Sequence, residues 1–287
     1  MVLALESSFE YRPLAVMIDN HPDAQPQSGM SDADIIYEAT VEFGITRFMA
    51  IFANNSPEVI GPVRSTRHYF VDWASEYDSI FVIAGASPQG HEELDKTGVT
   101  NIDLTYGEGV FWRVTERPAP HNLYTSGPGV REWHGPDEPG QLSEFEYKPD
   151  MQADSAEILG TIVVTYPDGY QVEYHYDESS NEYARFMSGE AHEDLVSGEQ
   201  YRAKNVIVQF MATRPIPGDD ASRIDMDLIG TGDAIVFQDG TRIEGTWRKT
   251  GATRSTVFLD DAGDRIKLNA GQTWIQVVPV EGSVESS

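Results

Sequence analysis

The chain has 287 residues, a length that suits two domains better than one. It carries 47 acidic and 20 basic residues, and the resulting net charge of −27 disfavours binding to nucleic-acid phosphates or to anionic membrane surfaces. The absence of cysteine excludes disulfides and thiolate metal sites, and no apolar run approaches the ~20 residues that span a bilayer.

Strand-like and helix-like segments alternate in the first 135 residues. An apolar run that ends at Asp19-Asn20 is typical of a buried strand, and two later strands are expected to form a hairpin that turns at Gly44. Strands are expected at residues 14–18, 36–43, 46–52 and 80–84, and helices at 64–77 and 88–96. The alternation predicts an α/β domain with a mixed sheet over residues 10–135.

The second half of the chain is predicted to consist almost entirely of short strands. Turn signals such as Pro167-Asp168-Gly169 separate apolar segments from about residue 158 onward. We therefore expect a linker over residues 136–157 and a β-rich domain, either a sandwich or a barrel, over residues 158–280.

Polar residues follow the expected strands of the first domain. Ligands of α/β sheets collect beyond the carboxyl ends of the strands, where this chain carries Asp19, Asn20, Arg64, Ser65 and Ser87. Ser65 lies at an expected helix start, which favours an anion. The alternative is that Ser65, or its neighbour, only caps the helix and that Asp19 only ends a turn.

Two more arginines, Arg67 and Arg47, and two glutamates extend this set. Arg64 and Arg67 are one helical turn apart and could hold a carbonyl or carboxylate, or could only neutralise nearby acids. Glu38 and Glu42 share the polar face of an expected strand, with Arg47 across the hairpin. Carboxylate oxygens of this kind suit Ca²⁺, although two glutamates that face water would produce the same pattern.

Histidines offer candidates for acid–base chemistry. His121-Asn122 follows a proline-rich loop, and an imidazole placed there could act as a general base near neutral pH. The seven histidines show no metal-ligand spacing in the sequence. No nucleotide-binding glycine loop, serine-hydrolase elbow or zinc-protease motif is present.

Several longer motifs resemble the YerB-like family of bacterial lipoproteins. They span nearly the whole chain: Leu14-Ala15-Val16-Met17-Ile18-Asp19-Asn20, Ile35-Ile36-Tyr37-Glu38, Gly44-Ile45-Thr46-Arg47-Phe48, Gly61-Pro62-Val63-Arg64-Ser65-Thr66-Arg67, Ala119-Pro120-His121-Asn122-Leu123-Tyr124, Gly245-Thr246-Trp247 and Gly271-Gln272-Thr273-Trp274-Ile275. The resemblance implies a small-molecule substrate and Ca²⁺-dependent hydrolysis of N-acyl-homoserine lactones, which is a quorum-quenching activity.

For this activity the resemblance and the residues together give a set of expected roles. Asp19, Glu38 and Glu42 are expected to hold the cation, His121 to act as general base, and Arg47, Arg64 and Arg67 to assist at the substrate's carbonyls. Substrate contacts are expected from Asn20, Ser65, Ser87 and Asn122. The alternative is an extracytoplasmic binding module without catalysis. The sequence leaves the oligomeric state open.

The resemblance also bears on location in the cell. We expect the native protein outside the cytoplasm or at the cell envelope, with a leader removed ahead of Met1, and a cytoplasmic protein is the alternative. The lipobox cysteine of the lipoprotein pattern is missing here, so this chain as written offers no thiol for lipidation.

Overall fold

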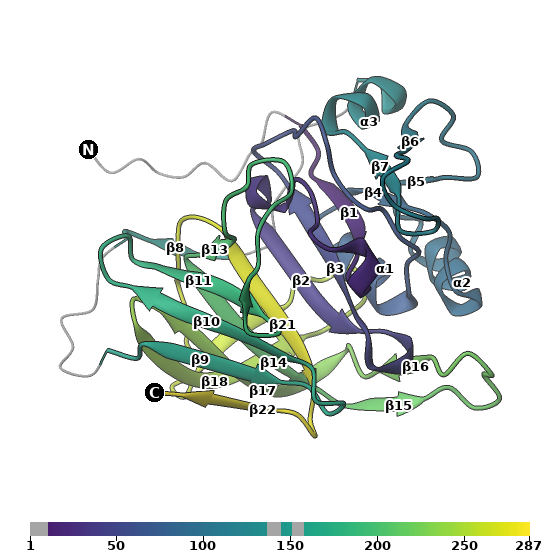
Figure 1. The fold of residues 1–287 in the computed structure, drawn as a ribbon. Helices are drawn as coiled ribbons and strands as arrows, with labels where there is room; N and C mark the ends of the chain where they lie inside the picture. The colour runs from purple at the N-terminus through teal and green to yellow at the C-terminus, as the bar shows by residue number, and fades with distance from the viewer. Residues whose placement is uncertain (1–10, 137–144, 151–157) are drawn as a thin grey trace.

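A ten-stranded mixed sheet forms the centre of the molecule (Figure 1). The computed structural model describes residues 11–136, 145–150 and 158–287. In sheet order the strands are β19 (Val257–Asp260), β18 (Thr241–Lys249), β17 (Gly230–Gln238), β14 (Asn205–Met211), β21 (Thr273–Pro279), β2 (Ile35–Thr40), β3 (Thr46–Phe52), β1 (Leu14–Asp19), β4 (Ile80–Ile83) and β5 (Asn101–Asp103).

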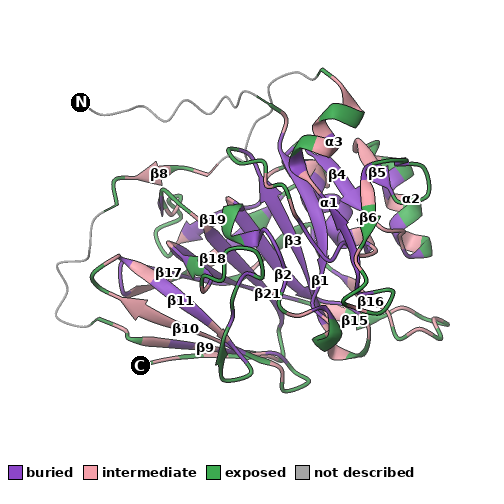
Figure 2. Ribbon diagram, turned by 45° about the horizontal axis from the view of Figure 1, so that its top comes forward, coloured by how far each residue is buried: buried purple, intermediate pink, exposed green. Residues whose placement is uncertain are grey.

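The two halves of the chain meet within this sheet. β21 pairs in parallel with β2 on one side and with β14 on the other, so strands of the amino-terminal and carboxy-terminal parts are hydrogen-bonded neighbours. Both faces of β2 are buried as a result, as the colouring of Figure 2 shows for the central strands.

A six-stranded antiparallel sheet covers one face of the central sheet. Its strands are β12 (Glu190–Ala191), β11 (Glu182–Met187), β10 (Gln171–Asp177), β9 (Thr161–Thr165) and β22 (Ser283–Ser286), with β13 (Arg202–Ala203) also paired to β11. Alternate residues such as Ile162, Val164 and Tyr174 point inward and share a core with Phe48 and Trp274 of the central sheet. The carboxy-terminal region is thus an open sandwich.

Helices cover the remaining surfaces of the central sheet. α1 (His68–Glu76) buries Tyr69, Phe70 and Trp73 against the face opposite the small sheet, and α2 (Pro88–Thr97) packs on α1. α3 (Gly127–His134) shares the core of the other face. The short elements are η1 (Pro22–Ala24), η2 (Met30–Asp32), η3 (Glu42–Gly44), and the strand pairs β6 (Phe111–Arg113) with β7 (Leu123–Thr125), β15 (Thr213–Pro215) with β16 (Ile224–Met226), and β8 (Tyr147–Lys148) with β20 (Leu268–Asn269).

The fold class predicted from the sequence is confirmed: a mixed sheet in the amino-terminal part precedes a strand-rich carboxy-terminal part. Among the described residues that part is a sandwich and not a closed barrel. The expected linker at 136–157 lies largely outside the described residues, and the domain boundaries stay predictions. No helix in the described ranges is long and apolar enough to cross a bilayer.

Two local predictions were wrong. The strand expected at 36–43 ends at Thr40, because residues 42–44 form a 3₁₀ turn in which Phe43 has φ = 58°, so Glu42 does not share a strand face with Glu38. The helix expected from Arg64 begins only at His68, and its N-cap position is Arg67, which makes no side-chain cap. Ser65 and its neighbour Thr66 therefore do not cap this helix.

Candidate functional site

Three chain segments meet at the carboxyl end of β1. The segment after Gly61 pairs with the end of β1, since the backbone N–H of Asp19 donates to Pro62 O at 2.9 Å. The N–H of Val63 donates to Leu123 O at 2.6 Å, which brings in the loop that carries His121. Glycine is required at 61, because a Cβ there would lie 2.9 Å from Leu123 O. Backbone pairing thus places Asp19 beside residues about 45 and 100 positions away.

Asp19 and His121 form a buried carboxylate–imidazole pair. Asp19 Oδ2 lies 2.8 Å from His121 Nδ1, and both residues are almost inaccessible to solvent. A carboxylate accepts hydrogen bonds, so Nδ1 carries the proton and the lone pair of Nε2 remains available. The ring of His21 stacks on that of His121 with 4.4 Å between centroids. This geometry orients the imidazole for proton transfer or for metal binding.

Three arginines surround the pair. Arg64 Nε lies 3.3 Å from Asp19 Oδ2, Arg67 Nε donates to Glu42 Oε2 at 2.9 Å, and Arg47 Nη1 donates to Ser65 O at 2.7 Å. In the described residues, the ion pairs of these three arginines go to two carboxylates, Asp19 and Glu42.

Burial and neighbouring charges shift the pKa values of Glu42 and Arg47 in this group. Burial opposes ionisation of Glu42, but the hydrogen bond from Arg67 and the charge of Arg47 outweigh it and lower the pKa of Glu42. Burial, followed by the charge of Arg67, lowers the pKa of Arg47 to about 10. Within the described residues the buried Nε of Arg47 has no hydrogen-bond partner. A buried donor without a partner is costly, so an acceptor supplied by a ligand would be favourable here.

Glu38 belongs to a different, buried hydrogen-bond network. Its Oε2 is 2.7 Å from Arg185 Nη2, and neither side chain is exposed. The network continues from Arg185 Nε to His192 Nδ1 at 3.0 Å, and from His192 Nε2 to Gln27 Oε1 at 2.7 Å. Burial and then the charge of Arg185 lower the pKa of His192 far below its usual value, so the ring is neutral. Its Nδ1 therefore accepts and its Nε2 donates.

Gln27 joins this network to the candidate site. Its amide donates to Asp19 O at 3.1 Å and to Asn20 Oδ1 at 3.0 Å. Arg185 of strand β11 is therefore linked, through His192 and Gln27, to the backbone that carries Asp19. Among the described residues, no hydrogen bond joins β11 directly to His121.

Of the four residues predicted to contact the substrate, one lies with the arginines and three make hydrogen bonds within the protein. Ser65 lies with the arginines, its Oγ 3.3 Å from Arg67 Nη1. Asn20 bonds to Thr46, Ser87 Oγ caps α2 by accepting from Gly90 N at 3.0 Å, and Asn122 bonds to Val114 O and Arg113. The hydrogen bonds of these last three are internal to the protein.

The carboxylates expected to hold calcium do not fit that role together. Each has an arginine partner of its own: Asp19 pairs with Arg64, Glu42 with Arg67, and Glu38 with Arg185. Calcium takes six to eight oxygen ligands and would have to displace these cations. The arrangement is that of neutralised carboxylates.

A different group brings side chains of metal-ligand type close together. One donor atom each from His21, Asp23 and His121 can be chosen so that all three lie within 4.8 Å of one another. The histidines show no such spacing in the sequence, because His121 is 100 residues away from His21 along the chain. The available signals were that His21 follows the end of an expected strand and that His121 follows a proline-rich loop.

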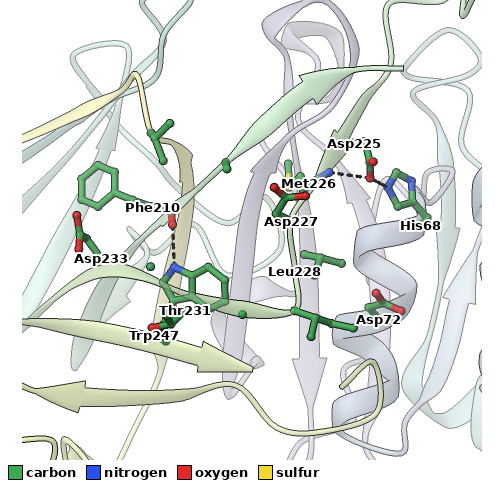
Figure 3. A pocket seen from close by; sticks show the side chains of 15 residues that line it. His68, Asp72, Phe210, Asp225, Met226, Asp227, Leu228, Thr231, Asp233 and Trp247 are labelled. Carbon is green, nitrogen blue, oxygen red and sulfur yellow. Dashed lines mark hydrogen bonds and ion pairs between the residues drawn. The ribbon is translucent and has the colours of Figure 1, made fainter. Parts of the chain in front are cut away.

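A separate open hollow of about 640 Å³ lies between α1, β16 and the strands β17 and β18 (Figure 3). His68 Nε2 lies 2.8 Å from Asp225 Oδ1 on one side, and Trp247 is fixed on the other by a bond from its Nε1 to Phe210 O. Asp72, Asp227 and Asp233 make the lining acidic. None of the residues predicted for the site lines this hollow.

Known proteins match nearly the whole chain. Residues 3–138 match "Protein of unknown function (DUF3048) N-terminal domain" and residues 162–275 match the corresponding C-terminal domain. The chain is 35% identical over 278 residues to "Putative lipoprotein YerB" of Bacillus subtilis (strain 168), covering 94% of this chain and 82% of that protein. The crystal structure of the YerB protein from Bacillus subtilis superposes with a TM-score of 0.84 at 34% identity, over 97% of this chain and 94% of that one. The chain belongs to the YerB-like family.

Proposed function

We propose that this protein is a hydrolase that opens the lactone ring of N-acyl-homoserine lactones, with His121 as the general base. The observation that carries the proposal is the 2.8 Å contact between Asp19 Oδ2 and His121 Nδ1 beside three arginines. The choice of substrate rests on the family resemblance. A location at the cell envelope, which the lipoprotein name of the Bacillus relative suggests for that protein, is part of the same proposal.

The reaction needs one water and returns its proton to the leaving group. His121 Nε2 takes a proton from water as the oxygen bonds to the lactone carbonyl carbon. Asp19 stabilises the resulting imidazolium, as a buried carboxylate does in other imidazole-based hydrolases. The bond between the carbonyl carbon and the ring oxygen then breaks, and that oxygen receives the proton from Nε2. The product is the open N-acyl-homoserine.

The arginines supply positive charge where the tetrahedral intermediate becomes negative. Arg64 is the most accessible of the three, with 28% of its side chain exposed, whereas Arg47 and Arg67 are nearly covered. We assign the contact with the carbonyl oxygen to Arg64, supported by the charge of Arg47 and Arg67 behind it. No step of this reaction passes through calcium.

The test is an assay on chelator-treated protein with an N-acyl-homoserine lactone, with and without added Ca²⁺, followed by mass spectrometry of the open acid. The proposal expects product, and expects its loss in His121→Ala with folding confirmed by circular dichroism. Product only after calcium addition would restore the calcium dependence that the resemblance implies. Folded protein without product under either condition would refute the hydrolase.

A binding module without catalysis is the second candidate. The open hollow beside Trp247 favours it, because its volume of about 640 Å³ falls in the range of small-molecule sites, ~300–1,000 Å³. In that case ligands bind saturably, without a product, and Trp247→Leu weakens binding whereas His121→Ala does not.

A further inference from the structure

The loop after β1 and the loop before β7 bring two imidazoles and one carboxylate together. His21 is the N-cap of the turn η1 and Asp23 lies within it, and His121 comes from the segment that pairs with residue 63. From the geometry we propose that His21, Asp23 and His121 bind a divalent transition-metal ion, such as Zn²⁺, Mn²⁺ or Co²⁺.

The donor set favours this class of ion over calcium. Two imidazole nitrogens and one carboxylate oxygen suit Zn²⁺ and its neighbours in the periodic table, while calcium requires mostly oxygen ligands. Three protein ligands leave a fourth position for water, as in catalytic zinc sites.

Asp19 already holds both histidines in place. Its Oδ2 accepts from Nδ1 of His121, and its Oδ1 accepts the backbone N–H of His21 at 3.1 Å. A carboxylate bonded to the far nitrogen of a ligating histidine is the usual support of a metal site, since it fixes the tautomer and raises the basicity of the other nitrogen. Arg117 anchors the other end of the His21 loop by donating to Pro26 O at 2.6 Å.

The remaining adjustment is confined to exposed side chains. Donors that lie up to 4.8 Å apart must close to about 3.3 Å around an ion with bonds of ~2.0–2.2 Å. The side chain of Asp23 is 63% exposed and that of His21 is 37% exposed. His21 Nδ1 accepts the backbone N–H of Asp23 at 3.2 Å, a bond that ligation through Nδ1 would have to replace. The three arginines beside the Asp19–His121 pair oppose the ion. Arg64 is paired with Asp19, and Arg47 and Arg67 are paired with Glu42.

Metal binding would change how water is activated in the proposed hydrolase, and this consequence rests on that proposed function. A bound ion would occupy the lone pair of His121 Nε2, so His121 would hold the ion instead of acting as the general base. The ion would then supply the activation of water, and the proton that the water loses would reach the ring oxygen by way of solvent. Coordination to zinc can lower the pKa of such a water to ~7. The oxygen–carbon bond formed and the ring bond broken stay the same.

Calorimetry on the full chelator-treated chain, titrated with Zn²⁺ and separately with Ca²⁺, tests the site without any substrate. We expect one Zn²⁺ per chain, and a loss of affinity of at least tenfold in His21→Ala and in Asp23→Asn. Co²⁺ should show visible absorption bands of a nitrogen- and oxygen-bound ion that the same variants weaken. Matched controls are His91→Ala and Asp261→Asn, which remove an exposed imidazole and an exposed carboxylate elsewhere.

Each outcome bears on one proposal or the other. No stoichiometric Zn²⁺ binding, equal affinity in the His21 and Asp23 variants, or tighter binding of Ca²⁺ than of Zn²⁺ would overturn the metal site. Stoichiometric binding in a protein that hydrolyses no lactone would keep the site and reject the hydrolase. Hydrolysis by protein that binds no metal would keep the hydrolase and reject the site.

Discussion

Arg185 of β11 and Glu38 of β2 form an ion pair with 2.7 Å between Nη2 and Oε2, and both side chains are fully buried. The guanidinium also lies 4.3 Å from the centre of the Trp274 ring and donates to the hydroxyl of Tyr174 at 2.6 Å. Burial opposes its charge, but Glu38 and the surrounding tyrosines outweigh this effect and raise the pKa of Arg185. One charge of the small sheet thus neutralises one of the central sheet.

Arg185→Met should reduce the free energy of unfolding by about 3–5 kcal/mol, because Glu38 would keep a buried charge without a partner. The double variant Arg185→Met/Glu38→Gln should be less destabilised than the single variant. Urea denaturation measures both values. The matched control is Arg202→Met in the neighbouring strand β13, where the pair with Asp177 is exposed and worth ~0–1 kcal/mol. Equal losses for Arg185 and Arg202 would contradict the assignment.

His192 should make the protein less stable in acid. Burial and Arg185 hold the folded-state pKa of His192 well below the unfolded value of ~6.5. The unfolded chain therefore binds a proton below about pH 6.5 that the folded protein does not, and stability from this group falls by up to ~1.4 kcal/mol per pH unit. His192→Gln should reduce this slope, measured by urea denaturation at pH 5 and pH 7.

His175, which is more exposed, serves as the comparison for His192. His175→Gln in β10 removes a ring that is 43% exposed, and the slope between pH 5 and pH 7 should then stay close to that of the parent protein. If both variants change the slope equally, the neutral buried state of His192 is wrong.

The sequence was informative about position and much less about contact. The apolar run before Asp19 and the proline-rich loop before His121 marked both residues as candidates, but nothing in the pattern predicted that they touch across 102 positions. Their meeting depends on the pairing of residues 61–64 with the end of β1 and with Leu123. Such backbone pairing between irregular segments leaves no periodic signal in a single sequence.

Glu38 shows why the sequence pattern suggested a shared calcium site for the glutamates. Alternation with period two correctly assigned it to the opposite face from Tyr37, and an exposed polar face was the natural alternative to a metal site. The parallel pairing of β2 with β21 and the covering small sheet bury that face instead. The partner, Arg185, lies 147 residues away, and only the three-dimensional fold brings it to Glu38.

Asp72 of α1 is expected to respond to pH in the opposite direction from His192. Burial, followed by the hydrogen bond and charge of Glu93, raises the pKa of Asp72 to about 7. Above the unfolded value of ~3.8 the unfolded chain releases this proton while the folded protein retains it, so stability falls as pH rises from about 4 to 7. Asp72→Asn should remove the penalty, and its gain in unfolding free energy should grow to at most about 4 kcal/mol at pH 8.

Thermal denaturation at pH 4.5 and pH 8 follows this change. Asp72→Asn should melt close to the parent at the lower pH and higher at the upper pH. Asp95→Asn, an exposed carboxylate on the next helix, should show no such difference. A gain for Asp72→Asn that is equal at both values would mean that its carboxyl is not protonated in the folded protein.

The last prediction concerns the Asp19–His121 pair at the candidate site. Asp19→Asn keeps the shape of the side chain but removes the charge that stabilises the His121 imidazolium and selects its tautomer. In the proposed hydrolase this should lower kcat by ~10²–10⁴ with little change in KM. Arg64→Ala removes the contact with the developing oxyanion and should lower kcat by ~10²–10³.

The split between kcat and KM separates these roles from loss of folding or of binding. Asp261→Asn, which removes an exposed carboxylate, should leave both constants unchanged. A variant of Asp19 that raises KM with kcat intact would show that Asp19 contributes to substrate binding and not to proton transfer. In that case His121 would not be the base, since an imidazole that loses the carboxylate on its Nδ1 should lose proton-transfer efficiency first.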